Sequence, residues 1–290
     1  MSAEVLAQTL INTMTSASIY VMMAVGFTLV FGTMRIVNFA HGAAYLAGAY
    51  GMFVFGTMAG LPFVLAVLIS VLVVVLASSA IEVTLVERTI DDGLKTMILT
   101  LGISLVVAGA IESIFGSTPV AVPSLAEGAY RFAGVSLPKE RAIVIVAGVV
   151  VMVGLWIFLR YFRWGQGLRA VSQDKEMAAA MGVPVRKMQA WGFGGAAGLA
   201  ALAGALIAPV LYSNPDIGDA ALVKAFMVVI IGGVGSVSGA VLAGILVALV
   251  ENIATVWLDA SVSGVITFTV VILVLIAAPR GIMGRTSERV

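Results

Sequence analysis

Long apolar runs, separated by short polar segments, make up most of this chain. A helix needs about 20 residues to cross the hydrocarbon core of a bilayer, and the runs are close to that length. They cover residues 5–31, 38–58, 62–83, 96–115, 142–159, 190–211, 240–257 and 262–278. We therefore predict an all-α polytopic membrane protein with about eight transmembrane helices.

Two apolar segments are broken by glycine and polar residues. The run 38–58 is interrupted early, by Asn38, His41 and Gly42, and the run 222–231 ends at the sequence GGVGSVSG, residues 232–239. About 10 residues at ~1.5 Å each span only half of the hydrocarbon core. We therefore expect 222–231 to be a broken half-helix.

The sequences beside the two breaks are alike. HGAAYLAGAY, residues 41–50, resembles SGAVLAGILV, residues 238–247, with one residue deleted. Glycine-interrupted helices at corresponding positions of two halves indicate a transport site near the midplane, although small-residue runs in membranes also match by chance. We expect the substrate pathway to be lined by Asn38, His41, Tyr45, Gly232, Gly233, Gly235, Glu251 and Asn252, with the glycine break opposite the other residues.

The polar segment 160–189 is rich in Arg and Lys and carries only two acids, Asp174 and Glu176. An excess of basic residues in a short loop between spans marks the cytoplasmic side. Counting spans from there places the N-terminus outside, the basic C-terminal tail in the cytoplasm, and the proline-rich segment 116–141 outside as an external loop.

A short helix is expected inside the cytoplasmic segment. Residues 173–181 are good helix formers, and Gly182 followed by Pro184 is typical of a helix end. Met177, Ala178 and Met181 would share one face of this helix. It is either an amphipathic element that transmits force to the spans or an ordinary solvated loop.

Composition and charge narrow the function further. Hydrophobic residues make up 61% of the 290 positions and charged residues only 11%, whereas soluble domains average about 25% charged. Without cysteine, thiol chemistry and cysteine-bound metals are excluded. The chain has no G-x-x-x-x-G-K-[ST] motif for ATP and no paired-carboxylate, H-E-x-x-H or Ser/His/Asp arrangement, so we expect neither an enzyme, nor a metal site, nor a nucleic-acid partner.

Polar side chains within apolar runs are costly and are functional candidates by default. They are Asn38, His41, Glu112, Lys224, Glu251 and Asn252. His41 is either a hydrogen-bonded interior histidine at a helix break or a proton carrier. Lys224 is expected at the outer end of its half-helix, where its ammonium can reach the interface, and Glu251 is expected to pair with Lys224 or with another chain.

Together these segments resemble a known family, the permease subunits of branched-chain amino-acid ABC importers. The resemblance rests on GFTLVFGTMRIVNFAHGAAYLAGAY (26–50), RAVSQDKEMAAAMGV (169–183), the segment 214–244 and PRGIMGR near the C-terminal end. It covers nearly the whole chain and is stronger for the subunit with the short N-terminus. Urea-importer permeases share much of the pattern.

The resemblance implies an ABC importer permease fold, a single permease domain over residues 1–290, and a place in the bacterial inner membrane. It implies a second permease subunit, an external substrate-binding protein, and two ATPase subunits that carry ATP and Mg, with no cofactor in this chain. The substrate would be a branched-chain or other hydrophobic amino acid, or alternatively urea or a short amide. ATPase coupling would fall to Arg169, Asp174, Met177, Ala178, Met181 and Gly182, with Ala178 facing the ATPase.

Two other classes of transporter remain open. An ion-coupled secondary transporter would depend on a lone intramembrane carboxylate, Glu112 or Glu251, and would need no partner. A passive solute channel would conduct without ATPase subunits.

Overall fold

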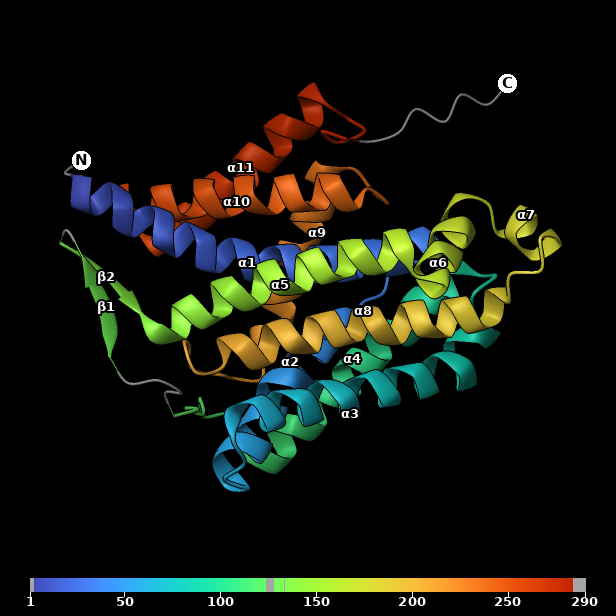
Figure 1. The fold of residues 1–290 in the computed structure, drawn as a ribbon, viewed down its shortest axis with the longest axis horizontal. Coiled ribbons are helices and arrows are strands. Elements are labelled where there is room, and N and C mark those ends of the chain that lie inside the picture. The colour runs from blue at the N-terminus through green and yellow to red at the C-terminus, as the bar shows by residue number, and fades with distance from the viewer. Residues whose placement is uncertain (1–2, 124–127, 133, 284–290) are drawn as a thin grey trace.

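The computed structural model describes residues 3–123, 128–132 and 134–283. In Figure 1 the long helices α1, α3, α5, α8 and α10 run side by side along the long axis of the molecule, and α2 and α9 pass behind them. The helices are α1 Ala3–Met34, α2 Ala40–Met52, α3 Phe63–Thr84, α4 Gly93–Phe115, α5 Lys139–Tyr161, α6 Arg163–Gln173, α7 Lys175–Ala180, α8 Val185–Ile207, α9 Ile217–Gly232, α10 Val237–Trp257 and α11 Ala260–Ala277. A π-helical segment, η1 Phe53–Met58, continues α2, and a short 3₁₀ segment, η2 Val86–Arg88, follows α3.

The apolar runs predict most of these helices. Within the described residues, six helices are long and apolar enough to cross a membrane: α1, α3 with its 3₁₀ extension, α4, α5, α8 and α10. The segments α2, α9 and α11 are apolar but shorter. The predicted half-helix is longer than expected, because α9 begins at Ile217 and reaches 16 residues.

Helices α1 and α8 form the centre of the bundle. In each, 72% of the most apolar window is buried inside the protein. Small residues let the backbones approach closely: a side chain at Gly48 of α2 would collide with the carbonyl of Ala201 on α8, and one at Gly204 of α8 with the carbonyl of Tyr45. Such contacts are the usual way for helices to associate in lipid, where no hydrophobic force draws them together.

The packing supports two related halves, but not in the alignment expected from the sequence. Helix α1 packs along α10, and α8 packs along α3 in the same way. The short helix α2 packs on α8, and the short helix α9 packs on α1. By packing, α2 therefore corresponds to α9. The similar sequences 41–50 and 238–247 lie on α2 and α10, so their likeness does not mark equivalent positions.

The two ends of the molecule carry different structures (Figure 1). At one end, a two-stranded antiparallel hairpin, β1 Ala129–Phe132 and β2 Val135–Pro138, lies beside the N-terminal half of α1, where the Ser136 amide donates to Gln8 Oε1 at 3.3 Å. The predicted external loop 116–141 therefore contains regular structure. At the other end α6 and α7 project from the bundle.

Candidate functional site

The first candidate region is the break between α1 and α2. Arg35 ends α1 with a φ of 56°, which a residue other than glycine rarely adopts. Asn38 then turns the chain into α2: its side-chain Oδ1 accepts from the Ala40 amide at 3.0 Å, and its carbonyl accepts from the His41 amide at 3.4 Å. Asn38 is buried, so its polar atoms serve the backbone of the break.

His41 lies on the first turn of α2 and is only 1% exposed. Its Nε2 is 3.0 Å from the carbonyl oxygen of Met23 in α1, which fixes the proton on Nε2 when the ring is neutral. Nδ1 has no hydrogen-bond partner among the described residues. Gly26 leaves room for the imidazole, because a Cβ there would be 3.0 Å from its Cε1. His41 thus locks α2 against α1 at the middle of the bundle.

Tyr45, one turn further on, is also buried. Helix α2 continues in close contact with α9, where a Cβ on Gly42 would be 2.5 Å from the carbonyl of Gly218. Gly218 lies on the first turn of α9 and Gly232 ends the helix, 14 residues or about 21 Å later. Phe39, beside Asn38, lies against Phe226 in the second half of α9, with ring centres 5.7 Å apart, and the position of the glycine break opposite Asn38, His41 and Tyr45 stays a prediction.

The break at residues 232–239 is a tight turn between α9 and α10. Gly233 and Gly235 have φ values of 96° and 85°, which only glycine adopts without strain. The end of α9 is covered by the segment after α11: the amides of Ile282 and Met283 donate to the carbonyls of Ile231 and Gly232 at 2.7 and 3.1 Å. These carbonyls have no partner within their own helix.

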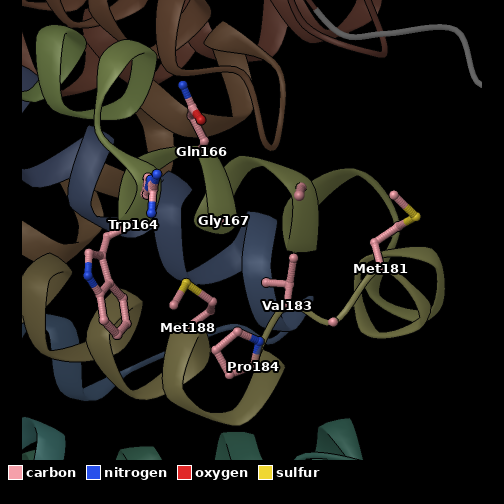
Figure 2. Close-up of a pocket in the computed structure, with 10 residues that line it drawn as sticks. Trp164, Gln166, Gly167, Met181, Val183, Pro184 and Met188 are labelled. Atoms are coloured by element: carbon pink, nitrogen blue, oxygen red, sulfur yellow. The ribbon is translucent and has the colours of Figure 1, made fainter.

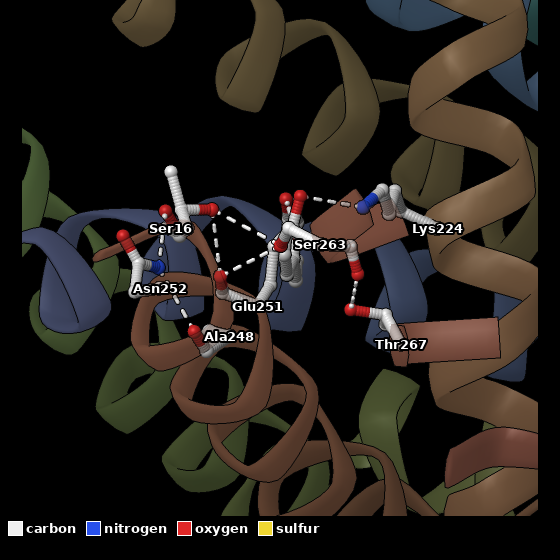
Figure 3. A network of polar contacts seen from close by, with 9 residues as sticks. Ser16, Lys224, Ala248, Glu251, Asn252, Ser263 and Thr267 are labelled. Carbon is white, nitrogen blue, oxygen red and sulfur yellow. Dashed lines mark hydrogen bonds and ion pairs between the residues drawn. The ribbon is translucent and has the colours of Figure 1, made fainter. Parts of the chain in front are cut away.

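The second candidate region is a polar network inside the membrane (Figure 3). Glu251 of α10 accepts from Lys224 Nζ of α9 at 2.6 Å and from the Tyr20 hydroxyl of α1 at 2.8 Å. The predicted pairing of Glu251 with Lys224 is confirmed. The expectation that Lys224 lies at the outer end of its half-helix is wrong, because α9 begins at Ile217 and Lys224 lies midway along it. Its ammonium also lies 5.7 Å from the Tyr20 ring centre.

Hydroxyl and amide groups extend this network to a fourth helix. Asn252 donates to Ser16 Oγ at 3.3 Å and to the Ala248 carbonyl at 2.8 Å, and Ser263 of α11 donates to the Glu251 carbonyl at 2.8 Å. The sequence did not mark Tyr20, Ser16 and Ser263 as candidate site residues, because such residues are common in transmembrane helices. Their contacts bind α1, α9, α10 and α11 together.

The remaining intramembrane acids behave differently from expectation. Glu112 lies on the exposed face of α4, outside the interior of this helix bundle. Glu82 of α3, which the sequence did not single out, is only 2% exposed. Among residues 3–123, 128–132 and 134–283 there is no group of three His, Asp or Glu side chains that could hold a metal ion.

The third candidate region is the segment 160–189, which forms two helices. Helix α6 was not predicted; α7 was expected over 173–181 and is shorter. Asp174 caps α7, accepting from the Met177 amide at 2.9 Å. Gly182, with a φ of 81°, ends it, and the Val183 amide donates to the Ala178 carbonyl at 3.0 Å. The helix end predicted at Gly182 is confirmed.

The face of α7 that turns inward differs from the expected one. Ala178 is 4% exposed and packs against Leu168, Val171 and Met188 of the same chain. Ala178 therefore cannot face a partner groove. Met177 and Met181 are 61% and 79% exposed, and they form the free edge of α7.

Beside this edge lies a hollow of about 460 Å³ (Figure 2). It is bounded by α6 on one side and by the residues that join α7 to α8 on the other, including Trp164, Gln166, Met181, Pro184 and Met188. Arg169 of α6 is exposed, and its guanidinium donates to the Arg160 carbonyl at 3.4 Å. Arg186 forms an ion pair with Glu87 of η2, which ties this segment to the turn between α3 and α4.

Comparison with known proteins identifies the family of this chain. Residues 9–275 match the family described as "Branched-chain amino acid transport system / permease component". The chain is 31% identical to the high-affinity branched-chain amino acid transport system permease protein LivH of Escherichia coli, over 96% of this chain and 95% of that protein. It is 32% identical to the permease protein BraD of Pseudomonas aeruginosa, over the same shares.

A more distant relative is the probable branched-chain amino acid transport permease protein LivH of Methanocaldococcus jannaschii, 28% identical over 92% of this chain and 89% of that protein. No solved structure matches the chain. The match runs through the α1–α2 break, the polar network and the α6–α7 segment alike, and it leaves no large part of the chain outside it. This multi-pass membrane protein belongs to the family of permease components of branched-chain amino acid transport systems.

Proposed function

We propose that this chain is a membrane subunit of an ATP-driven importer and forms half of a translocation pathway for branched-chain or other hydrophobic amino acids. The observation that carries the proposal is the identity to LivH and BraD over 96% of this chain. Those proteins are named as permeases of high-affinity branched-chain amino acid transport systems. Urea or a short amide is the alternative substrate class.

ATP hydrolysis would belong to separate subunits, which carry ATP and Mg, because this chain has no phosphate-binding loop. The edge of α7 and the hollow beside it supply a docking surface for such a subunit. Two exposed methionines suit this role, since a flexible thioether follows an irregular partner surface. Asp174 and Gly182 fix the two ends of α7, and Ala178 anchors it to α6 and α8.

The orientation of the chain in the membrane suggests where its other partners would bind. The basic segment 160–189 favours the cytoplasm, so the N-terminus and the hairpin would face outward in the bacterial inner membrane and the C-terminus inward. An external substrate-binding protein would dock at the hairpin end. A second permease subunit would complete the pathway, with Asn38, His41, Tyr45, Gly232, Gly233, Gly235, Glu251 and Asn252 as the residues of this chain that shape it.

The substrate is tested by uptake into vesicles that contain the complete transporter and its binding protein. Labelled leucine should accumulate when ATP is supplied inside and should be displaced by isoleucine and valine, but not by urea or acetamide. Displacement by urea alone would establish the alternative substrate class. Leucine movement that is independent of ATP would exclude an ATP-driven importer.

Docking is tested at Met181. Met181→Glu places a charge on the free edge of α7 and should reduce substrate-stimulated ATP hydrolysis and uptake together by about tenfold or more, since an unpaired buried charge costs at least ~1.4 kcal/mol. Met181→Leu keeps an apolar side chain of similar size and is the matched control. Because Met181 is 79% exposed, neither change disturbs the fold. Normal ATP hydrolysis and uptake in Met181→Glu would show that the ATPase docks elsewhere.

A further inference from the structure

A narrow apolar slot opens on the side of the bundle near α6. Helices α5 and α8 barely touch each other, yet both pack on α1, so a gap of about 490 Å³ remains between them. Leu29 of α1 and Leu155 and Phe158 of α5 contribute to its walls, and Leu168 of α6 belongs to the same lining. The slot is therefore bounded by three long helices and α6.

On the α8 side, the slot is open because a glycine, Gly195, stands in the middle of the lining face. Trp191, Gly195 and Leu199 follow one another at intervals of four residues and so share a face of the helix. Residues on the other faces of α8 in this stretch are mostly buried against neighbouring helices, whereas Gly195 is exposed. A Cβ added at Gly195 would meet no atom within 4 Å in the described part of the chain. Any larger side chain at this position would enter the slot.

The α6 end of the slot combines aromatic and cationic groups. Trp164 and Trp191, with ring centres 6.0 Å apart, both line it, and indole rings favour the level of lipid headgroups. Arg163, the residue before Trp164, lines the neighbouring hollow, and Arg160 and Arg169 are exposed close by in sequence. The nearest acid in sequence, Asp174, is engaged as the cap of α7.

From these features we propose that the slot is a binding site for an anionic phospholipid. One acyl chain lies between α5 and α8 over Gly195, the glycerol backbone lies at the level of Trp164 and Trp191, and the phosphate interacts with Arg163. Basic residues at a groove between transmembrane helices attract anionic headgroups in this way.

The size of the slot favours a lipid chain over a helix of a second subunit. A helix with its side chains is about 10–12 Å across, so ~490 Å³ would hold little more than one of its turns. An extended hydrocarbon chain is much thinner and can fill the length between Gly195 and the aromatic end.

The position of the site gives the lipid a role. Helix α6 follows α5 directly and leads to α7. An acyl chain packed against α6 would therefore fix the position of the 163–180 segment relative to the transmembrane helices. This role does not depend on which solute is transported or on where the ATPase docks.

The test is photolabelling of the assembled transporter in vesicles that contain phosphatidylglycerol or phosphatidylcholine with a photoreactive group on one acyl chain. Labelled peptides are mapped by mass spectrometry. Phosphatidylglycerol should label residues 155–159 and 191–199 several times more than phosphatidylcholine does. Equal labelling by the two lipids, or labelling spread evenly over α4 and α10, would refute the proposal.

Two variants separate the chain from the headgroup. Gly195→Phe should reduce labelling of the slot by about tenfold (~1.4 kcal/mol), while Gly102→Phe should leave it unchanged, because Gly102 also has open space around it in the described structure but lies on α4, which does not line the slot. Arg163→Gln should lower the preference for phosphatidylglycerol by about fivefold (~1 kcal/mol) without abolishing labelling. If neither lipid labels the wild-type slot, another subunit fills it and the lipid site does not exist.

Discussion

Glycine residues decide how closely the central helices approach. At Gly48 and Gly204 the backbones of α2 and α8 touch, and at Gly42 and Gly218 those of α2 and α9 do. Glycine on α4 has a different meaning, because Gly102 has open space around it in the described structure. Sequence alone cannot separate these two kinds of glycine, since both occur in small-residue patterns.

We predict that Gly48→Ala destabilises the protein by about 1–3 kcal/mol, the usual cost of overpacking. The added methyl group would collide with Ala201 and force α2 away from α8. Gly102→Ala should have little effect and serves as the control. The comparison is the unfolding temperature of the purified complexes, followed by tryptophan fluorescence. Equal temperatures for the two variants would show that α2 and α8 do not pack in this way.

Individual side-chain contacts were predictable from the sequence only where a residue has a single chemically suitable partner. Lys224 and Glu251 are opposite charges in apolar runs, and such charges must pair. The inward orientation of Ala178 was not predictable, because its partners Leu168 and Val171 belong to α6, a stretch that reads as a charged loop.

The polar network shows how an ion pair joins helices that are distant in sequence. Lys224 on α9 meets Glu251 on α10 (Figure 3), and the Tyr20 hydroxyl on α1 donates to the same carboxylate. Inside a membrane, removing one member leaves an unpaired charge, and in buried pairs this costs about 3–5 kcal/mol. Removing both charges together is far less harmful.

A double-mutant cycle follows from this. Lys224→Met and Glu251→Leu should each strongly lower the unfolding temperature, whereas the double variant Lys224→Met/Glu251→Leu should recover most of the loss. Uptake measured in parallel separates structure from function: a stable double variant without uptake would assign the pair a role in transport. If the single variants are as stable as the wild type, the ion pair contributes nothing to the fold.

Secondary structure was predictable wherever an apolar run was long and uninterrupted. Helices α1, α3, α4 and α10 follow their runs closely. Sequence failed at α6, whose 11 residues include three glycine or tryptophan positions in a basic stretch, and at the hairpin, whose strands are only four residues each. These elements are stabilised by contacts with α5, α8 and α1, which a local pattern does not reveal.

Contacts between segments that are far apart in the sequence help to hold the whole bundle together. The loop after α4 meets the loop after α8, where Val120 and Ser213 exchange two hydrogen bonds of 2.8 and 3.0 Å. The residues after α11 return to α9 through Ile282 and Met283. The pattern of apolar runs predicts the number and order of the apolar segments. Contacts between loops that are distant in sequence depend on the three-dimensional path of the chain, which this pattern does not give.

Truncation tests the closure at α9. A chain shortened after Pro279 loses the two amide donors and the contact of Gly281 with Gly233, so it should lose about 2 kcal/mol of stability at ~1 kcal/mol per hydrogen bond. A chain shortened after Met283 retains them and is the matched control. The readout is again the unfolding temperature of the purified complex. Identical values for the two truncations would show that the covering of α9 is dispensable.

The covering of α9 also has a consequence for biosynthesis. Ile231 and Gly232 leave the ribosome about fifty residues before Ile282 and Met283, which supply their hydrogen-bond donors. During that interval α10 and α11 are made and inserted, while the end of α9 exposes free carbonyls in or near the bilayer. A nascent chain that stalls within α10 or α11 therefore leaves the last carbonyls of α9 without these donors, and unpaired backbone carbonyls are costly in a bilayer.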